Sequence, residues 1–425
     1  MDSSFSITVG VIAVFTLFWG VFIAFLFFDA ARKKLPPVGH RVAQVSKLYV
    51  YPIKGARGIE LSCAVLSKYG IYLDRFWMVA KARNNQFVTQ RCHSMMAQVK
   101  VQLEDKAHKC IGSDEQAGDG EAVWKQAAYL RVTHSTLDLP PLVVSIPGRG
   151  ETATSSSSEK VLTTKVWNDD VQCVDEGDEA GEWFTKALNA KEPLRLFRTA
   201  PSSQFLRTIP ERFARRAGET VKASDNTAAL ADGFPFLIVS ENAMQALNAR
   251  LPSSVGPMNL DRFRGNVVVS IDAPTKGQAL TGTPFLELPA RTGVAGAFHE
   301  DTWGRIAIGR GASKGGKEIV LASAKPCTRC TVPTLDQKTG ERAPNNEPTR
   351  TLRDVLGRGS RYVKEKEGQW SIFFGQNMVQ IPPSQRGRLP AAFDEAWGTL
   401  RVADEVRILK WQRAELVAHM NAGLN

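Results

Sequence analysis

Several kinds of motif are missing from this chain of 425 residues. The six cysteines are mostly scattered, without the density of a secreted disulfide framework, and this favours a reducing compartment. No Gly-x-Gly-x-x-Gly follows a predicted strand, which argues against a dinucleotide-binding unit. No cysteine set for an iron–sulfur cluster and no Cys-x-x-Cys-His for a haem is present. The sequence therefore indicates no flavin, iron–sulfur or haem centre.

Charge of one sign is in excess, although the overall composition is that of a globular protein. Hydrophobic residues make up 43% and charged residues 23% of the chain, which excludes a wholly disordered, collagen-like or multi-span membrane protein. Lys and Arg number 54 against 43 Asp and Glu, a net charge of +11, and residues 1–34 contribute only +1 of it. The remaining body, at +10, could meet nucleic acid, anionic lipid, a phosphorylated cofactor or an acidic protein.

The long hydrophobic run is confined to the N-terminus. Phe5 to Phe28 form 24 residues without a charge, and a helix of that length crosses a hydrocarbon core of about 30 Å. A cleaved signal peptide is the competing interpretation, but its apolar region usually spans about 7–15 residues behind a positive start. The cluster Arg32-Lys33-Lys34 follows the run, so the body is expected to face the cytosol. We predict a transmembrane anchor with its basic flank at 1–34 and a spacer at 35–42.

The body is predicted to be strand-rich and mixed α/β, without a repeat of fixed period. Ser240 is predicted to cap a helix over 241–250, and another helix is expected around 181–188. Residues 111–121 and 148–160 are polar and Gly/Ser-rich, as in surface loops. The charged stretch 211–216 is short and mixed in sign, so a solvated surface is favoured over a nucleic-acid patch. The predicted strands cover 41–50, 70–82, 237–240, 264–271, 305–308, 318–321 and 400–409.

One local motif carries chemistry: Cys327-Thr-Arg-Cys330, expected on a turn entered through Pro326. A structural zinc site would need two further Cys or His ligands at suitable spacing, which the chain lacks. A thioredoxin-like pair should open a helix, whereas Pro333 follows in a stretch expected to be extended. One thiolate could instead bind a metal whose other ligands come from a cofactor, with Arg329 holding an anionic group. Two unreactive cysteines on a loop remain the alternative.

Six short motifs, spread along residues 43–410 in a fixed order, resemble one known family. The chain is similar to MOSC (molybdenum cofactor sulfurase C-terminal) proteins that also carry an N-terminal MOSC β-barrel, and particularly to amidoxime-reducing components. The resemblance implies an N-terminal MOSC β-barrel domain at 43–200 and a MOSC β-barrel domain at 201–425. The matching stretches are Tyr51-Pro-Ile-Lys-Gly55, Asp74-Arg-Phe-Trp77, Pro235-Phe-Leu-Ile-Val-Ser240, Arg262-Phe-Arg-Gly-Asn-Val-Val268, Glu300-Asp-Thr-Trp303 and Cys327-Thr-Arg-Cys330.

The resemblance also implies a cofactor and a set of residues that bind it. The cofactor is the molybdenum cofactor, Mo-molybdopterin, whose dithiolene supplies two sulfurs while one protein thiolate completes the metal's ligands. By motif position that thiolate is the catalytic residue Cys330, and Cys327 is a neighbour. Arg75 could instead form a surface ion pair, and Asn266 could merely cap a turn. The positions expected to bind the cofactor are Lys54, Gly55, Arg75, Arg264, Asn266, Thr328, Arg329 and Cys330.

The sequence departs from the pattern of the family's reductases at two places. Gly55 follows Lys54 where those reductases have serine, and Asp232-Gly-Phe234 replaces a hydroxyl-bearing stretch. A backbone N–H can replace a hydroxyl donor, so these changes affect the expected substrate more than the expected cofactor.

The function implied is a membrane-anchored molybdenum-dependent reductase of amidoximes, hydroxylamines and N-oxides. The chain shows no redox centre besides the implied one, so its electrons are expected to come from outside. The resemblance implies cytochrome b5 and NADH-cytochrome b5 reductase as the donors. The mitochondrial outer membrane is favoured as its location, with the endoplasmic reticulum as the alternative; no nucleic-acid partner is expected. Two other functions stay open: a cofactor-binding or sulfur-carrier module without reductase activity, and a non-catalytic membrane-tethered β protein.

Overall fold

The computed structural model describes residues 38–111, 120–150, 161–200, 207–217, 226–272, 293–310, 318–360, 371–381 and 397–412. The expected membrane helix at 5–28 and its basic flank lie outside these ranges, as do residues 35–37 of the spacer and most of the loops expected at 111–121 and 148–160. The rest of the expected spacer is described, and its last two residues belong to strand β1, which begins at Arg41. Within the described ranges, no helix combines the length and the apolar character that crossing a bilayer requires.

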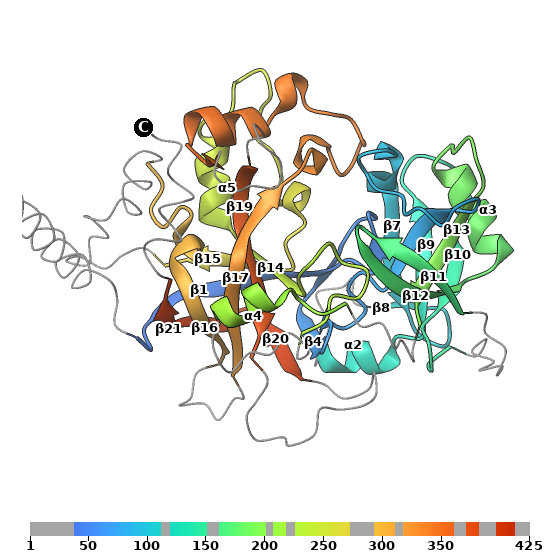
Figure 1. The fold of residues 1–425 in the computed structure, drawn as a ribbon, viewed down its shortest axis with the longest axis horizontal. Coiled ribbons are helices and arrows are strands. Elements are labelled where there is room, and N and C mark those ends of the chain that lie inside the picture. Colours follow the sequence, from blue (N-terminus) through green and yellow to red (C-terminus); the bar gives the residue numbers. More distant parts are fainter. Residues whose placement is uncertain are drawn as a thin grey trace, which may run out of the picture.

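Seven strands close into a β-barrel, which occupies the left half of Figure 1. Strand β14 closes the ring because it pairs with β15 on one side and with β19 on the other. A closed ring satisfies the backbone of every strand and leaves no edge for another chain. Around the barrel the order is β14 (Phe236–Ser240), β15 (Val267–Ile271), β1 (Arg41–Val50), β21 (Glu405–Trp411), β16 (Trp303–Gly309), β17 (Ile319–Arg329) and β19 (Ser371–Gln380).

Strand β14 is an unbroken apolar run because it is buried on both faces. Alternate side chains of a strand point to opposite faces, and both faces of this strand are covered. Phe236 and Ile238 pack into the main core, whereas Leu237 and Val239 pack into a second core with Ala243 of helix α5 (Glu241–Asn248). The structure confirms the predicted helix start, since the Ser240 hydroxyl accepts a hydrogen bond from the Ala243 amide.

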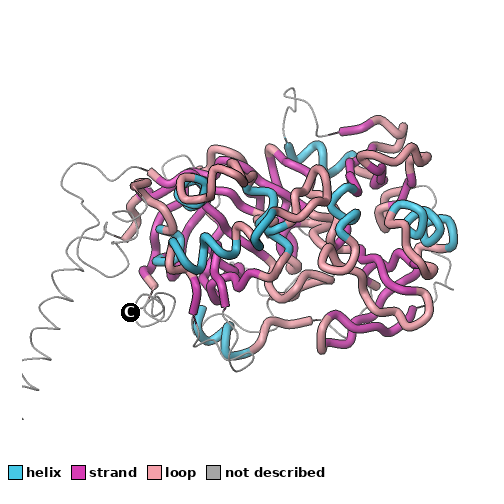
Figure 2. The backbone as a smooth tube through the Cα atoms, turned by 90° about the horizontal axis from the view of Figure 1, so that it is seen from above, coloured by secondary structure: helices cyan, strands magenta, loops and turns pink. Residues whose placement is uncertain are grey.

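The rest of the N-terminal half forms three open sheets beside the barrel, two of which lie on the right of Figure 1, and the third includes β20 from the end of the chain. Helix α3 (Asp178–Ala187) packs against β13 and β10, and this confirms the helix expected around 181–188. Figure 2 shows strands running through both parts of the molecule with short helices against them. The sheets are β11 (Val161–Val166), β12 (Asp169–Asp175), β13 (Leu194–Thr199), β6 (Trp77–Lys81) and β2 (Ile53–Lys54); β10 (Leu142–Ser145), β9 (Tyr129–His134), β7 (Val99–Glu104) and β8 (Cys110–Ile111); and β20 (Gly398–Arg401), β4 (Cys63–Ser67) and β5 (Gly70–Ile71).

The two halves of the sequence interleave in space. Strand β1 comes from the start of the body but lies between β15 and β21 in the barrel. Conversely, β20, from the end of the chain, pairs with β4. The domain boundaries at 43–200 and 201–425 stay predictions. The remaining elements are β3 (Ile59–Leu61), β18 (Gly359–Ser360), α2 (Gly120–Gln126), α4 (Glu211–Ala217) and short turns at Ser94–Gln98, Leu260–Phe263, His299–Thr302, Val332–Thr334, Pro344–Asn346 and Thr351–Val355.

Three predicted segments differ from the structure. The strand expected over 70–82 is broken between β5 and β6, because Leu73 and Arg75 take left-handed conformations with φ of 67° and 51°. The strand expected over 400–409 is two strands separated by a turn at Ala403, whose φ is 71°. The stretch after Cys330, expected to be extended, is a single 3-10 turn, Val332–Thr334, with a proline in its first turn.

Candidate functional site

The sequence predicted that both cysteines of the motif lie on one turn, and this prediction is wrong. Cys327 lies within β17, and Cys330 follows the last residue of that strand and is exposed. The strand continues past Pro326 because its register against β19 shifts between Pro326 and Thr328, where a residue without an N–H is tolerated. The Val332 amide donates to the Cys330 Sγ at 3.5 Å, which orients the thiol at the strand end.

Arg329 is directed toward Cys327 and away from the end of the strand. Its Nη1 donates to the Cys327 Sγ at 3.0 Å and its Nη2 donates to the Phe263 carbonyl at 2.7 Å. The buried Nε of Arg329 has no hydrogen-bond partner among the described residues. Thr328 is half-buried between the two cysteines and lies opposite Phe373 of β19. The guanidinium therefore fixes the strand end and keeps one donor available.

Two further predicted arginines converge on one aromatic ring. The guanidinium carbons of Arg75 and Arg264 each lie 4.4 Å from the centroid of the Tyr51 ring. Both residues have left-handed backbones, with φ of 51° and 54°. Burial, together with repulsion from Arg75, lowers the pKa of Arg264 to about 10. The Nη1 of Arg264 is buried without a hydrogen-bond partner in the described structure.

Asp74 and Asn266 hold this pair of arginines in place. Arg75 forms an ion pair with buried Asp74 and donates from Nη1 to the Asn266 Oδ1 at 3.2 Å. Asn266 in turn donates from Nδ2 to the Asp74 Oδ1 at 3.1 Å, and the Tyr51 amide donates to the same oxygen at 2.9 Å. Asn266 thus belongs to a buried network and does not merely cap a turn, and Arg75 is not part of a surface ion pair.

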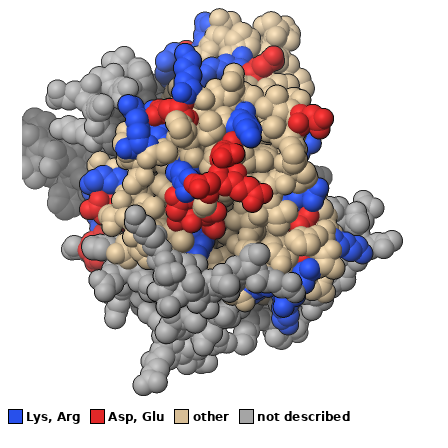
Figure 3. Space-filling model, turned by 90° about the vertical axis from the view of Figure 1, so that its right-hand side faces the viewer, with Lys and Arg blue, Asp and Glu red and all other residues tan. Residues whose placement is uncertain are grey.

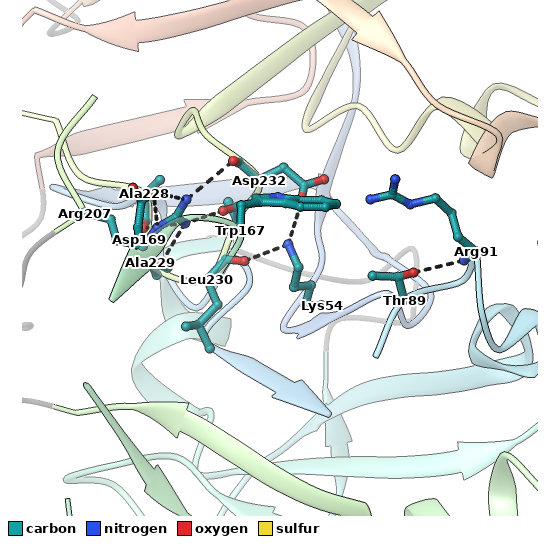
Figure 4. Close-up of polar contacts among 11 residues, drawn as sticks. Lys54, Thr89, Arg91, Trp167, Asp169, Arg207, Ala228, Ala229, Leu230 and Asp232 are labelled. Carbon is teal, nitrogen blue, oxygen red and sulfur yellow. Dashed lines mark hydrogen bonds and ion pairs between the residues drawn. The ribbon is translucent and has the colours of Figure 1, made fainter. Parts of the chain in front are cut away.

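Lys54 lies in a second group of polar residues, shown in Figure 4. Its ammonium is buried and donates to the Leu230 carbonyl at 3.0 Å and to the Asp232 Oδ1 at 2.5 Å. The indole Nε1 of Trp167 donates to the same carboxylate oxygen at 3.1 Å. Burial lowers the pKa of Lys54 despite the neighbouring carboxylate. Desolvation opposes ionisation of Asp232, but the Lys54 ammonium outweighs it and lowers the pKa of that carboxyl.

The turn after Lys54 requires glycine. Gly55 has a φ of +89°, and a Cβ at this position would meet the Met96 Cε at 3.1 Å. Its carbonyl accepts from the Gln90 Nε2 at 2.7 Å, and Gln90 also donates to the Gln337 Oε1 at 2.9 Å. The backbone conformation at residue 55 therefore favours the glycine found here over the serine of the family's reductases. Only main-chain groups of residue 55 can contact a ligand.

The loop around Gln90 approaches the turn that carries Cys330. Arg342 donates from Nη2 to the Arg91 carbonyl at 3.3 Å and from Nη1 to the Thr331 carbonyl at 3.4 Å. The structure thus places Lys54 and Gly55, through the 90–91 loop, beside the Cys330 turn. Arg75, Arg264, Asn266 and Arg329 are linked to each other through Tyr51, Phe263 and the 264–266 backbone.

Some residues of the site carried no sequence signal. Trp167 follows a predicted polar loop and does not stand beside any matching stretch. Arg207 is buried and donates to the Asp169 Oδ2 at 2.9 Å and to the Ala231 carbonyl at 2.5 Å. The hairpin that carries Trp167 has a two-residue loop, Trp167-Asn168. The usual signal for such a loop is Asn-Gly or Asp-Gly, and this pair does not match it. Asp232 was visible in the sequence only as a departure from the family pattern.

In the described part of the chain, protein side chains alone do not form a metal site. Among the described residues, no group of three or more His, Cys, Asp or Glu side chains is arranged to hold a metal ion. A metal bound at the exposed Cys330 would therefore take its other ligands from a cofactor or solvent.

Comparison with known proteins places two family domains on the chain. The MOSC N-terminal beta barrel domain matches residues 42–191, and the MOSC domain matches residues 225–407. A mitochondrial amidoxime-reducing component 1 from Mus musculus is 26% identical over 326 residues, covering 76% of this chain and 73% of that protein. A component 2 from Bos taurus is 28% identical over 331 residues, covering 76% and 74%. A component 1 from Homo sapiens is 25% identical over 373 residues, covering 87% and 84%.

Proposed function

Because the chain belongs to the proteins that join a MOSC N-terminal β-barrel domain to a MOSC domain, we propose that it is a molybdenum-cofactor-dependent reductase of N-hydroxylated compounds. One observation carries the proposal: the exposed thiol of Cys330 stands at a strand end, next to Arg329, whose buried Nε has no hydrogen-bond partner among the described residues. The names of the relatives, amidoxime-reducing components, supply the substrate class.

The residues of the site fit a phosphorylated pterin cofactor. The unpartnered Arg264 Nη1 and Arg329 Nε are donors that suit phosphate or polar pterin edges. Arg75 would act beside Arg264, and an anion would relieve the repulsion between the two guanidiniums. Lys54, the backbone of Gly55, Asn266 and Thr328 would complete the binding groups, and the Cys330 thiolate would be the protein ligand of molybdenum.

The reaction proposed is a two-electron reduction. An amidoxime, R–C(NH₂)=NOH, takes up two electrons and two protons, the N–O bond breaks, and an amidine, R–C(NH₂)=NH, and water are released. The cofactor supplies the two-electron redox chemistry when it is bound. The chain's own residues would hold it, orient the thiol through the Val332 amide, and provide the pair of buried Lys54 and exposed Asp232 at the site.

The electrons are proposed to come from cytochrome b5 and NADH-cytochrome b5 reductase. The body without residues 1–34 carries +10, which would steer an acidic donor toward it. This positive charge is not evenly spread over the surface: Figure 3 shows acidic side chains gathered on the face that carries α3. That helix begins with Asp178 and Glu179. We therefore expect the donor to dock on another face.

The location proposed is the cytosolic side of the mitochondrial outer membrane, with residues 5–28 as the anchor. The relatives' names state a mitochondrial location, and the uncharged run is long enough to span. The endoplasmic reticulum would accept the same segment.

Elemental analysis of the purified protein, combined with the fluorescence of its oxidised pterin, tests the proposal. We expect close to one molybdenum and one pterin per chain, together with reduction of benzamidoxime when the donor chain is supplied. Molybdenum and pterin without reduction would point to a carrier module, and absence of both would contradict the proposed function.

A further inference from the structure

Trp167 adopts a backbone conformation that a bulky residue rarely takes. It lies at the tip of the β11–β12 hairpin, where Val166 pairs with Asp169 and only two residues form the loop. Its φ is 58°, and the residue as a whole is 44% exposed to solvent. A tryptophan at a position suited to glycine is strained by about 1–3 kcal/mol. Such strain persists only where the surrounding structure holds the residue in place.

The contacts around Trp167 hold the indole in one place. Its Nε1 donates to the Asp232 Oδ1 at 3.1 Å, and its ring meets Phe87 edge to face with centroids 5.1 Å apart. Two residues further on, Asp169 accepts from Arg207, which also binds the carbonyls of the 228–232 loop. The hairpin tip is thereby attached at two points, through Trp167 to Asp232 and through Asp169 to Arg207, as Figure 4 shows.

A planar cation already rests against this indole. The guanidinium carbon of Arg91 lies 4.6 Å from the centroid of the Trp167 ring, and Arg91 is exposed. Its loop is joined to Gly55 through Gln90 and to the Cys330 turn through Arg342. The stacked pair therefore stands between Lys54, whose partner Asp232 binds the indole, and the turn of the candidate metal ligand.

We propose that the exposed face of Trp167 is the stacking surface for the planar head group of amidoxime substrates and of the amidines formed from them, and that Arg91 occupies it until such a head group displaces its guanidinium. This inference rests on the proposed function for the substrate class. A guanidinium and a protonated amidine share a planar, delocalised, cationic head, and indole is the aromatic ring that attracts such cations most strongly. An amidoxime has the same planar head without the charge and would stack on the ring through its flat face. Trp167 is thus a specificity-determining residue, placed beside the cofactor site by the strained hairpin.

Binding of benzamidine to the holoenzyme, measured by titration calorimetry, tests the stacking directly. Benzamidine has no N–O bond, so its binding is independent of electron transfer. Trp167→Gly relieves the backbone strain and removes the ring, and we expect the Kd to rise about tenfold while the melting temperature is kept. Trp167→Phe keeps a ring and loses only the Asp232 bond, and its Kd should stay within about threefold of the wild type. Equal Kd values for the wild type and Trp167→Gly would overturn the proposal.

A matched control is available in the turn between β20 and β21. Ala403 is also an exposed left-handed residue, and its carbonyl accepts from the Gln44 Nε2. Ala403→Gly changes the same backbone property, so its Kd for benzamidine should equal that of the wild type. A tenfold change in this variant as well would assign the effect to backbone flexibility and contradict stacking on Trp167.

Arg91→Ala has the opposite expected sign. If the guanidinium must leave, its removal should tighten benzamidine binding about threefold. Benzamide, which is planar and neutral, should show the same direction, and this separates vacating the ring from loss of charge repulsion. Weaker binding of both ligands to Arg91→Ala would overturn the displacement.

Kinetics separate this inference from the proposed function. The KM for benzamidoxime should rise about tenfold in Trp167→Gly with kcat little changed, whereas the KM for trimethylamine N-oxide, which lacks a planar head, should not change. A wild type that reduces neither compound but binds benzamidine through Trp167 would contradict the proposed function alone. A wild type that reduces both, with an unchanged KM in Trp167→Gly, would contradict the inference alone.

Discussion

Arg75 and Arg264 lie on the same ring: both guanidinium carbons are 4.4 Å from the centroid of Tyr51. Only Arg75 has a carboxylate partner, Asp74, and the Arg264 Nη1 is left without an acceptor among the described residues. The two arginines, which the sequence suggested for the same task, therefore differ in how much they support the fold and how much they offer to a ligand.

Substitution of these two arginines should give different results. Arg264→Ala removes a guanidinium that stacks on Tyr51 but has no carboxylate partner, so molybdopterin occupancy should fall strongly while the free energy of unfolding changes by only about 1 kcal/mol. Arg75→Ala leaves buried Asp74 without its partner and should cost about 3 kcal/mol of stability in addition to cofactor. Pterin fluorescence and denaturant unfolding measure the two effects. Wild-type occupancy in Arg264→Ala would show that this guanidinium does not bind the cofactor.

The two cysteines should also separate. Cys330→Ser should abolish reduction of benzamidoxime with a stability change below about 0.5 kcal/mol, because the residue is exposed. Cys327→Ser should keep a large fraction of activity, since a serine hydroxyl can also accept from Arg329. Activity and molybdenum content of both variants are compared. Equal losses would favour a dithiol pair or a two-cysteine metal site, and an active Cys330→Ser would exclude it as the metal ligand.

Glu300 makes the stability of the barrel depend on pH. It is fully buried, receives a hydrogen bond from Ser240, and stands beside the Asp301–Arg358 ion pair. Burial, with repulsion from Asp301, raises the pKa of Glu300 to about 7. Because the folded pKa lies above the unfolded value, its contribution to stability is complete below about pH 4.5 and is lost as the pH rises through 7.

Glu300→Gln should remove this loss. At pH 8.5 the variant should be more stable than the wild type by about 3 kcal/mol, and at about pH 4 the two should agree closely. His299, whose pKa burial lowers to about 4, acts in the opposite sense below pH 6.5 in both proteins and cancels in the comparison. Urea unfolding at the two pH values measures the difference. A constant difference across pH would contradict titration of Glu300.

The N-terminal segment is tested by removal and by topology. Deleting residues 1–34 should release a soluble protein that still contains molybdenum, because the barrel begins at Arg41. In intact mitochondria or microsomes, added protease should digest the body of the full-length protein without detergent. Protection of the body would reverse the proposed orientation and separate the enzyme from a cytosolic electron donor.

Local patterns in the sequence predicted the regular elements well. The alternation over 41–50 and the serine before the helix of residues 241–248 are determined by neighbouring residues, so both were correct. The break between β5 and β6 was not predicted, because Arg75 gives no sign of a left-handed backbone that is held by Asp74, Asn266 and the Arg264 carbonyl. Those partners are distant in sequence, apart from Asp74.

The candidate site shows the same limit. The family motif indicated Cys330, Lys54 and the arginines, but it did not indicate that Arg329 turns toward Cys327. Trp167 and Arg207 depend on a hairpin tip contacting the 228–232 loop, and such long-range contacts have no signature in either segment alone. Their roles could be seen only once both segments were placed.

The position of β1 has a consequence for how the protein is made. The barrel's first strand in sequence, Arg41–Val50, leaves the ribosome long before one of its two barrel neighbours, Glu405–Trp411. The barrel therefore cannot close while the segment between them is being made, whereas the sheets β11-β12-β13-β6-β2 and β10-β9-β7-β8 need no later strand. Until its late neighbour arrives, the nascent β1 has an unpaired edge that needs protection from aggregation.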